Sequence, residues 1–249
     1  LRRRLLDPSD ARFLSAGDLE KCLVALEATL FKTLLGGESL TNYRAWVISS
    51  MGTFEGIRAA QTGQSAAPAL IDEIRKWKTP TWSEITLNLN PSPEGEWFSV
   101  YDELGSRPTL ALLDAIEERN SGPVGLGLLP SLWEAGAVEE PFWVEHIFPQ
   151  ADSLWAEQLR AANSKNPEKV LDAMRKSLHC LGNLTALPAT VNASVGKKTF
   201  ADKKARVANA PMLPMHLNAW LSLPDWDLVR IGARNTQMIS DLATLWAGS

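Results

Sequence analysis

Apolar residues recur every three to four positions through the first half of the chain, which is the spacing of an amphipathic helix. The clearest stripe lies within residues 18–35 and ends at Gly36-Gly37, a common helix terminus. Its members are Leu19, Cys22, Leu23, Leu26, Leu30 and Leu34. Further helices are predicted at 42–60, at 68–78, after the capping-box pattern Thr81-Trp82-Ser83-Glu84, and at 108–119. We therefore expect residues 1–132 to form a helical scaffold or interaction region.

The pattern changes after a Gly- and Pro-rich connector at residues 122–132, which we interpret as a domain boundary. Mixed β-branched and aromatic residues then predict a strand at 142–148. The other elements predicted within 133–249 are a helical insertion at 151–181, a strand at 184–187, a helix at 190–206 and closing helices at 211–247. The predicted fold class is mainly α, with a helical domain followed by a domain in which two short strands and a helix are embedded in helices.

The composition is that of a globular protein, because 45% of the 249 residues are apolar and 22% are charged. No apolar run approaches the roughly 20 residues that a membrane-spanning helix needs. The ten Trp residues lie on apolar stripes and are expected as core anchors. The net charge of −4 is unevenly distributed: residues 1–140 hold 13 basic against 20 acidic residues (−7), and residues 141–249 hold 12 against 9 (+3). Only the second part suits a polyanionic partner.

Two features of the sequence concern the cellular compartment and the N-terminal end of the chain. Cys22 and Cys180 lie far apart and match no metal-ligand spacing, so we expect buried thiols in a reducing, cytoplasmic compartment. The chain begins Leu1-Arg2-Arg3-Arg4, without Met and without the apolar segment of a signal peptide. We expect it to be part of a longer protein.

The first chemically suggestive group is Glu145-His146, three residues before Pro149. Neighbouring side chains on a strand point to opposite sides, unless the strand ends there and turns. Pro149 provides such a break, which would let both side chains reach one site. Taken alone, however, a His beside an acid is most often an ordinary surface or core residue.

Asn183 and Asn192 form a second group, one before the second predicted strand and one near the start of the following helix. Local context favours a turn residue or helix cap for either. An amide oxygen is nevertheless a hard ligand suited to magnesium or manganese.

The third group is a basic stretch that directly follows Asn192. Residues 197–206 contain five basic side chains against one acidic side chain. The five are Lys197, Lys198, Lys203, Lys204 and Arg206. A charge run is usually a solvated helix face, but beside a metal ligand it could contact phosphates.

The order of these groups resembles that of a ββα-metal, or HNH, nuclease. The segment Val144–Gln150 reads Val-Glu-His-Ile-Phe-Pro-Gln and is similar to Val-Asp-His-Ile-Val-Pro-Gln of the HNH domain in CRISPR effector nucleases. A closer resemblance is to the C-terminal nuclease domain of GmrSD-type modification-dependent restriction enzymes, which include SspE-type anti-phage nucleases. That family carries Glu-His-Ile-x-Pro-Gln, Leu-Gly-Asn-Leu-Thr-x-Leu, Asn-Ser and Phe-x-x-Lys. The corresponding residues are Glu145–Gln150, Leu181–Leu187, Asn192 with Ser194, and Phe200 to Lys203 or Lys204.

The sequence departs from the family pattern at two positions and in one spacing. Ala186 interrupts the Leu-Thr-Leu-Leu run, and Ala193 separates Asn192 from Ser194. Residues 151–181 separate the two motifs, which implies a helical insertion inside the finger.

The resemblance implies a role for each group. His146 would be the general base, and Asn192 would bind one divalent metal (Mg²⁺ or Mn²⁺) with Glu145. Asn183 would belong to the catalytic set mainly by holding the loop that carries His146. The five basic residues 197, 198, 203, 204 and 206 would contact DNA phosphates.

The resemblance also implies partners. The substrate would be double-stranded DNA, nicked or cut through both strands. An N-terminal, nucleotide-hydrolysing sensor domain of the same full-length protein would direct this effector in restriction or anti-phage defence. The alternatives are a DNA-binding or regulatory module without catalysis, and an interaction protein whose acidic half docks on the sensor domain.

Overall fold

The computed structural model describes residues 15–38, 40–60, 66–90, 98–121, 142–161, 166–210 and 213–247. The chain forms two compact units: Leu1–Leu87 with Trp246–Ser249, and Asn88–Leu245. The division therefore comes between Leu87 and Asn88, whereas the sequence suggests residues 122–132, a segment that lies outside the described residues. The assignment of a scaffold role to one part and a nuclease role to the other remains a prediction.

The first unit is helical, as its apolar stripes predict. It contains α2 (Ala16–Leu35), α3 (Leu40–Ala60), α4 (Ala67–Ile74) and the start of α5 (Trp82–Leu89). The predicted capping box is present: Glu84 accepts a hydrogen bond from the Thr81 backbone at 2.7 Å, and Thr81 Oγ1 accepts one from the Glu84 backbone at 3.3 Å. These bonds satisfy amide groups that the first turn of α5 would otherwise leave unpaired.

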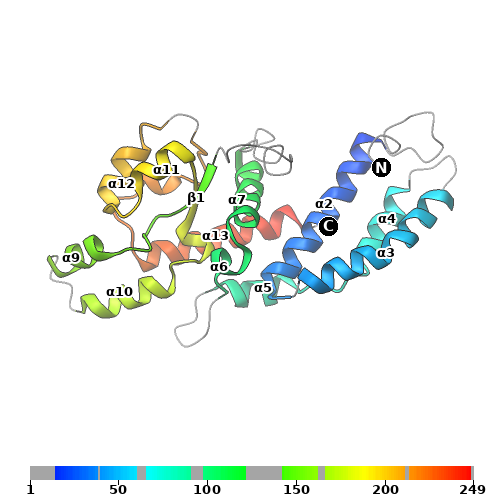
Figure 1. The fold of residues 1–249 in the computed structure, drawn as a ribbon, viewed down its shortest axis with the longest axis horizontal. Helices are drawn as coiled ribbons and strands as arrows, with labels where there is room; N and C mark the ends of the chain where they lie inside the picture. The colour runs from blue at the N-terminus through cyan, green and yellow to red at the C-terminus, as the bar shows by residue number, and fades with distance from the viewer. Residues whose placement is uncertain are drawn as a thin grey trace. The chain divides into compact units, whose positions relative to one another are not determined.

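The second unit contains the chemically suggestive residues and a single small sheet among its described elements (Figure 1). Its elements are α6 (Val100–Leu104), α7 (Ser106–Ser121), β1 (Phe142–His146), α9 (Ser153–Ala161), α10 (Pro167–Lys176), η1 (Leu181–Asn183), β2 (Leu184–Pro188), α11 (Ala189–Val195), α12 (Phe200–Val207), η2 (Ala219–Ser222) and α13 (Leu228–Leu245). The fold is mainly α with a ββα element formed by β1, β2 and α11, which confirms the predicted fold class.

The two strands form an antiparallel pair in which His146 lies opposite Leu184 and Glu145 lies opposite Thr185. The intervening segment contains α9 and α10, so the helical insertion is present. The helix predicted at 190–206 is instead two helices, because the chain turns at Gly196, where φ is +34°. Thr199 then caps α12, its Oγ1 accepting a hydrogen bond from the Asp202 backbone at 3.2 Å.

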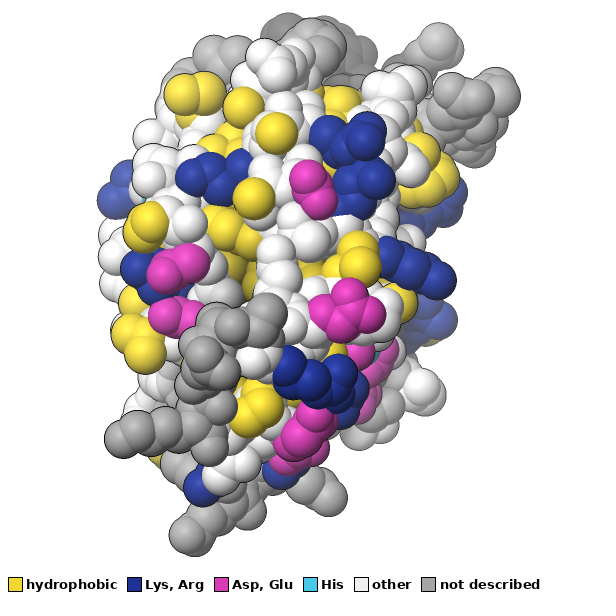
Figure 2. All heavy atoms as spheres, turned by 90° about the vertical axis from the view of Figure 1, so that its left-hand side faces the viewer, with side chains coloured by type: hydrophobic (Ala, Val, Ile, Leu, Met, Phe, Trp, Pro, Cys, Tyr) yellow, Lys and Arg dark blue, Asp and Glu magenta, His cyan; other side chains and the backbone are white. Residues whose placement is uncertain are grey.

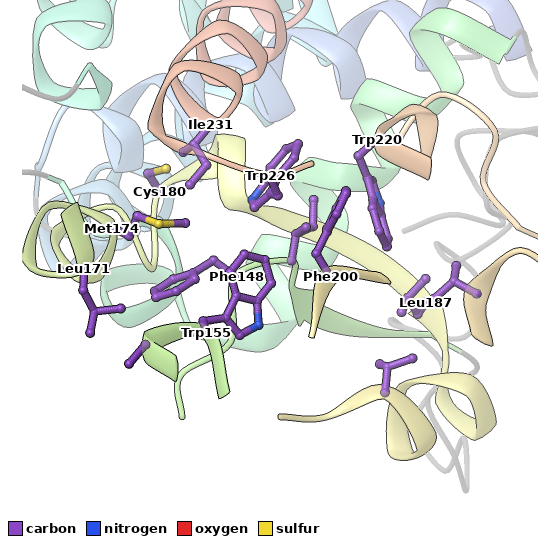
Figure 3. Close-up of a cluster of buried hydrophobic side chains, with 14 residues drawn as sticks. Phe148, Trp155, Leu171, Met174, Cys180, Leu187, Phe200, Trp220, Trp226 and Ile231 are labelled. Atoms are coloured by element: carbon purple, nitrogen blue, oxygen red, sulfur yellow. The ribbon is translucent and has the colours of Figure 1, made fainter. Parts of the chain in front are cut away.

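A cluster of buried apolar side chains supports this unit (Figure 3). Aromatic rings dominate it: the Phe148 and Trp155 rings meet edge to face at 5.2 Å, and Phe200 stacks on Trp226 at 6.2 Å. The Trp residues of this cluster are Trp155, Trp220 and Trp226, and each is the core anchor that the sequence predicts. Trp143 on β1 is an exception, because 47% of it is exposed.

Helix α13 packs closely against the turn before β2. A Cβ atom on Gly182 would lie 2.3 Å from the carbonyl oxygen of Ile231, so glycine alone permits this approach. Asn235 accepts a hydrogen bond from the Gly182 backbone at 2.9 Å, and Arg234 donates to the carbonyls of Gly182 (2.8 Å) and Leu184 (2.7 Å). These contacts fix η1 and the start of β2.

The described part of the chain contains no helix that is both long and apolar enough to cross a membrane.

Candidate functional site

Glu145 and His146 end strand β1 and point to opposite sides of it, as the pleat of a strand requires. Both are buried. The carboxylate of Glu145 meets Lys203 of α12, whereas the ring of His146 meets His179, which lies between α10 and η1. The strand break at Pro149 therefore does not bring the two side chains into one site.

The His146 side of the strand holds a cluster of rings. His146 Nε2 lies 3.0 Å from His179 Nδ1, which is a hydrogen-bond distance. The Tyr101 ring stacks on His179 at 5.7 Å and meets His146 edge to face at 4.9 Å. The other ring nitrogen of His179, Nε2, lies 3.5 Å from a carboxylate oxygen of Asp102. Tyr101 and Asp102 both come from α6.

Burial lowers the pKa of His146 to about 3, and the neighbouring His179 and Lys203 add to the shift. Burial also lowers the pKa of His179, although the Asp102 carboxylate opposes this change. Both rings are therefore neutral near pH 7. A neutral imidazole has one ring nitrogen that can accept a proton.

The Glu145 side of the strand holds a buried ion pair. Lys203 Nζ donates to Glu145 Oε1 and, at 2.6 Å, to the carbonyl oxygen of His146. Burial raises the pKa of Glu145 and lowers that of Lys203, and in each case the partner's charge opposes the shift. The pair joins α12 to the end of β1 and holds the backbone of His146.

The position of Lys203 corrects its predicted role as a DNA contact. Only 1% of the residue is exposed, because Phe200, Lys203 and Val207 form the inward face of α12. Lys204 is half-buried: its Nζ donates to the carbonyl of Leu223 and lies 5.6 Å from the Phe200 ring centre. A phosphate would have to displace these partners.

The other three basic residues of the stretch remain accessible. Lys197 and Arg206 are exposed, and Lys198 is half-buried. Figure 2 shows Lys and Arg side chains interspersed with Asp and Glu on the face that it displays. Exposed ion pairs of this unit include Arg160–Glu168 and Arg175–Asp152, each at 2.6 Å.

Asn183 is completely buried and uses its whole amide group. Its oxygen accepts hydrogen bonds from the Phe148 backbone (2.8 Å) and from the Trp226 ring (3.1 Å). Its nitrogen donates to the carbonyls of Phe148 (3.0 Å) and Leu178 (2.8 Å). An amide has two donors and two acceptor positions, so none remains for substrate or metal. Asn183 holds the chain after His146, and a direct catalytic role is not retained for it.

Asn192, on α11, differs from Asn183 in both burial and bonding. It is half-buried, and its nitrogen donates to the carbonyl of Val144 on β1 at 3.2 Å. Among the described residues, no hydrogen-bond donor meets its oxygen. That oxygen can therefore serve as a ligand.

The contacts of Glu145 and Asn192 indicate which of these predicted metal ligands has an oxygen available for a cation. Within the described ranges, no three His, Cys, Asp or Glu side chains are grouped as a metal site would require. Glu145 does not fit as a ligand in this arrangement, because Lys203 occupies its carboxylate on the side of β1 away from His146. Asn192 fits as a single oxygen ligand. Magnesium usually keeps several waters and binds substrate phosphates beside one or two protein carboxylates, so with Asn192 alone most of its ligands would come from water and phosphate.

His179, Tyr101 and Asp102 are not among the residues that the sequence motifs indicate. His179 carries the strongest sequence signal of the three, because it is one of only three histidines and lies four residues before Asn183. Tyr101 and Asp102 carried no signal, since their approach to His146 depends on the tertiary fold.

Comparison with known proteins identifies the family of the chain. The family model described as GmrSD restriction endonucleases, C-terminal domain, matches residues 104–241, which is more than half of the chain. The chain belongs to this family. Neither the curated proteins nor the solved structures provide a match.

Membership in the GmrSD C-terminal family confirms the resemblance drawn from the motifs and indicates a restriction nuclease acting on DNA. The matched range contains both strands, α11, α12 and His179. Tyr101 and Asp102 precede it.

Proposed function

We propose that the chain is a metal-dependent DNA endonuclease domain of the ββα-metal (HNH) type, with His146 as its general base. The observation that carries the proposal is the position of a neutral imidazole at the end of β1, next to the helix that presents Asn192. Membership in a family of restriction nucleases supports the reaction class.

His146 accepts a proton from the attacking water in this proposal. A general base must be unprotonated at the working pH, and burial keeps His146 unprotonated, although a lowered pKa also weakens the affinity of the ring for the proton. Its Nε2 is engaged by His179, so Nδ1 is the nitrogen assigned to accept the proton. Lys203, through the carbonyl of His146, and Asn183, through the backbone of Phe148, hold the strand end on which the ring sits.

Asn192 is the proposed protein ligand of one Mg²⁺ or Mn²⁺ ion. Such an ion would neutralise charge on the scissile phosphate and on the leaving 3′ oxygen. Val144 orients the amide by accepting from its nitrogen, which leaves the oxygen for the cation. Glu145 is not assigned to the metal, because its charge is already compensated by Lys203.

Three of the five basic residues are retained as DNA contacts. Lys197, Lys198 and Arg206 can each approach a phosphate without breaking a buried interaction. Contacts of this type position a duplex and carry no sequence information. We assign recognition of a modified site to other residues, in keeping with the proposed effector role beside an N-terminal sensor domain.

Plasmid cleavage tests the proposal. Wild-type protein, His146→Ala and His146→Gln are compared with Mg²⁺ or Mn²⁺ and with excess chelator. Loss of a general base is expected to reduce the rate by about 10²–10⁴-fold. His216→Ala is the matched control, because His216 pairs with Asp241 at 3.2 Å and takes no part in the proposed site. Cleavage above a tenth of the wild-type rate in both His146 variants would exclude His146 as the base.

A binding titration at low salt, run beside the cleavage assay, identifies a non-catalytic DNA-binding module. That alternative requires DNA binding without metal-dependent cleavage by the wild-type protein.

A further inference from the structure

We propose that His179 is a positioning residue that holds His146 in the tautomer with its proton on Nε2, and that Asp102 in turn orients His179. The inference rests on the proposed function, because it concerns the nitrogen from which His146 acts. It is carried by a chain of three side chains from three separate elements, namely β1, the segment before η1, and α6.

The first step is the contact between the two rings. The 3.0 Å separation of His146 Nε2 and His179 Nδ1 requires one proton between two nitrogens. Either His146 donates from Nε2 and keeps an unprotonated Nδ1, or His179 donates from Nδ1 and His146 carries its proton on Nδ1. Only the first arrangement leaves His146 with a proton acceptor that is directed away from His179.

The second step is the charge on the far side of His179. A carboxylate only accepts hydrogen bonds, and Asp102 Oδ2 lies 3.5 Å from His179 Nε2. This carboxylate favours a proton on His179 Nε2. In a neutral ring protonated there, Nδ1 is the acceptor, and it accepts the hydrogen bond that His146 Nε2 donates. The carboxylate therefore selects the arrangement in which His146 Nδ1 is the free acceptor.

The third step is the packing that keeps the rings in place. Tyr101 stacks on His179 with only 12° between the ring planes, and its ring plane lies at 80° to that of His146. The Tyr101 backbone also donates to the carbonyl of His179 at 3.3 Å. Ser99 donates to Asp102 Oδ2 at 2.8 Å, which restrains the carboxylate although more than half of its side chain is exposed. One short helix thus supplies both the stacking ring and the charge.

This arrangement defines the proton transfer. As water attacks phosphorus, one O–H bond breaks and the proton bonds to His146 Nδ1. The water oxygen forms a new P–O bond while the bond to the leaving oxygen breaks, and solvent protonates that oxygen. The proton on His146 Nε2 stays in its hydrogen bond to His179, which stabilises the imidazolium. Neither His179 nor Asp102 gains or loses a proton.

A tautomer measurement tests the inference without using activity. Two-bond ¹H–¹⁵N spectra of protein labelled with ¹⁵N-histidine distinguish protonated from unprotonated ring nitrogens. The chain has three histidines, and His146→Gln and His216→Gln assign their signals. We expect both His146 and His179 to be protonated on Nε2. A His146 signal showing the proton on Nδ1 would overturn the inference, whatever the outcome of the cleavage assay.

A matched pair of variants tests the effect on rate. His179→Phe keeps a ring to stack on Tyr101 and removes the acceptor, whereas His179→Gln keeps an acceptor oxygen and removes the ring. Loss of an orienting partner is expected to lower kcat by about 10–100-fold in His179→Phe, with KM unchanged. His179→Gln should recover most of that loss. Equal losses in the two variants would assign His179 a packing role only and overturn the inference.

The two assays separate failure of the inference from failure of the proposed function. Unaffected cleavage in His146→Gln would refute the general base, while the tautomer spectrum of the wild-type protein would still report the hydrogen bond. Strong loss in His146→Gln with no loss in His179→Phe would keep the general base and refute the positioning role.

Discussion

The polar groups on the two sides of strand β1 have different roles. On one side, Glu145 and Lys203 are both charged types, both buried, and bonded to one another. On the other side, His146 and His179 are neutral rings, and the charge of Asp102 is kept at the solvent-exposed end of the chain. The ion pair uses its charges to anchor α12 to β1. The ring pair keeps a proton acceptor. The comparison indicates that substitutions on the first side act on stability and substitutions on the second act on rate.

The largest expected effect on stability comes from breaking the ion pair. Lys203→Met leaves the buried carboxylate of Glu145 without its partner, which is expected to lower the free energy of unfolding by about 3–5 kcal/mol. Urea unfolding measures the change. Lys197→Met is the matched control, because Lys197 is exposed and its replacement should stay within about 0.5 kcal/mol.

The double variant Glu145→Gln/Lys203→Met sharpens this comparison. Removing both charges should restore much of the lost stability, because no isolated charge is then buried. If the single Lys203→Met variant is as stable as the wild type, the pair is not the anchor that its burial suggests.

Asn192 should give the next largest effect, and on rate rather than on stability. Asn192→Ala removes an oxygen ligand, so cleavage at a fixed metal concentration should fall at least tenfold, about 1.4 kcal/mol in barrier height. Raising the Mn²⁺ concentration should recover part of this loss. His146→Gln should show no such recovery. Identical metal dependence in the two variants would contradict the division of roles between ligand and base.

The sequence predicts the elements of this unit better than the contacts between them. Strand signals around His146 and Leu184 are local, since β-branched and aromatic residues and Pro188 act within the strand itself. The side on which Lys203 lies depends on the turn at Gly196, which ends one helix and sets the rotation of the next. If that turn is not taken into account, the run of basic residues suggests a helix face that is exposed to solvent.

In the candidate site, too, the residues of the motifs can be predicted from the sequence but their tertiary contacts cannot. His146, Asn183 and Asn192 are identifiable from a motif because they are close in sequence to β1 and β2. His179 reaches His146 only through the pairing of those strands, and Asp102 reaches His179 only through the packing of α6. Contacts of this kind leave no periodic pattern in the chain.

The lowered pKa of His146 predicts how the stability of the fold depends on pH. Its pKa is about 3 in the folded chain and about 6.5 when unperturbed, so only the unfolded state binds the proton between these values. Its contribution to stability is therefore complete above pH 6.5 and is lost as the pH falls from 6.5 towards 3. The loss amounts to at most about 1.4 kcal/mol per pH unit.

Unfolding of the wild type and of His146→Gln, measured from pH 7 to pH 4, tests this sign. The wild type should lose more stability on acidification than the variant, because the variant lacks the titrating ring. Parallel curves would mean that the pKa of His146 is the same in the folded and the unfolded chain, which would contradict the lowering by burial.

The smallest expected effect concerns the exposed cations near the site. Lys197 and Arg206 are proposed to contact phosphates, so replacing each by Ala should reduce the log–log salt dependence of DNA binding by about one unit. Cleavage at saturating DNA should persist, because these charges position the duplex and take no part in the reaction. Binding titrations at several salt concentrations measure the slope, with Lys169→Ala on α10 as a control outside the basic stretch. An unchanged slope in the double variant would make the basic stretch a solvated surface, and the DNA path would have to be sought elsewhere on the second unit.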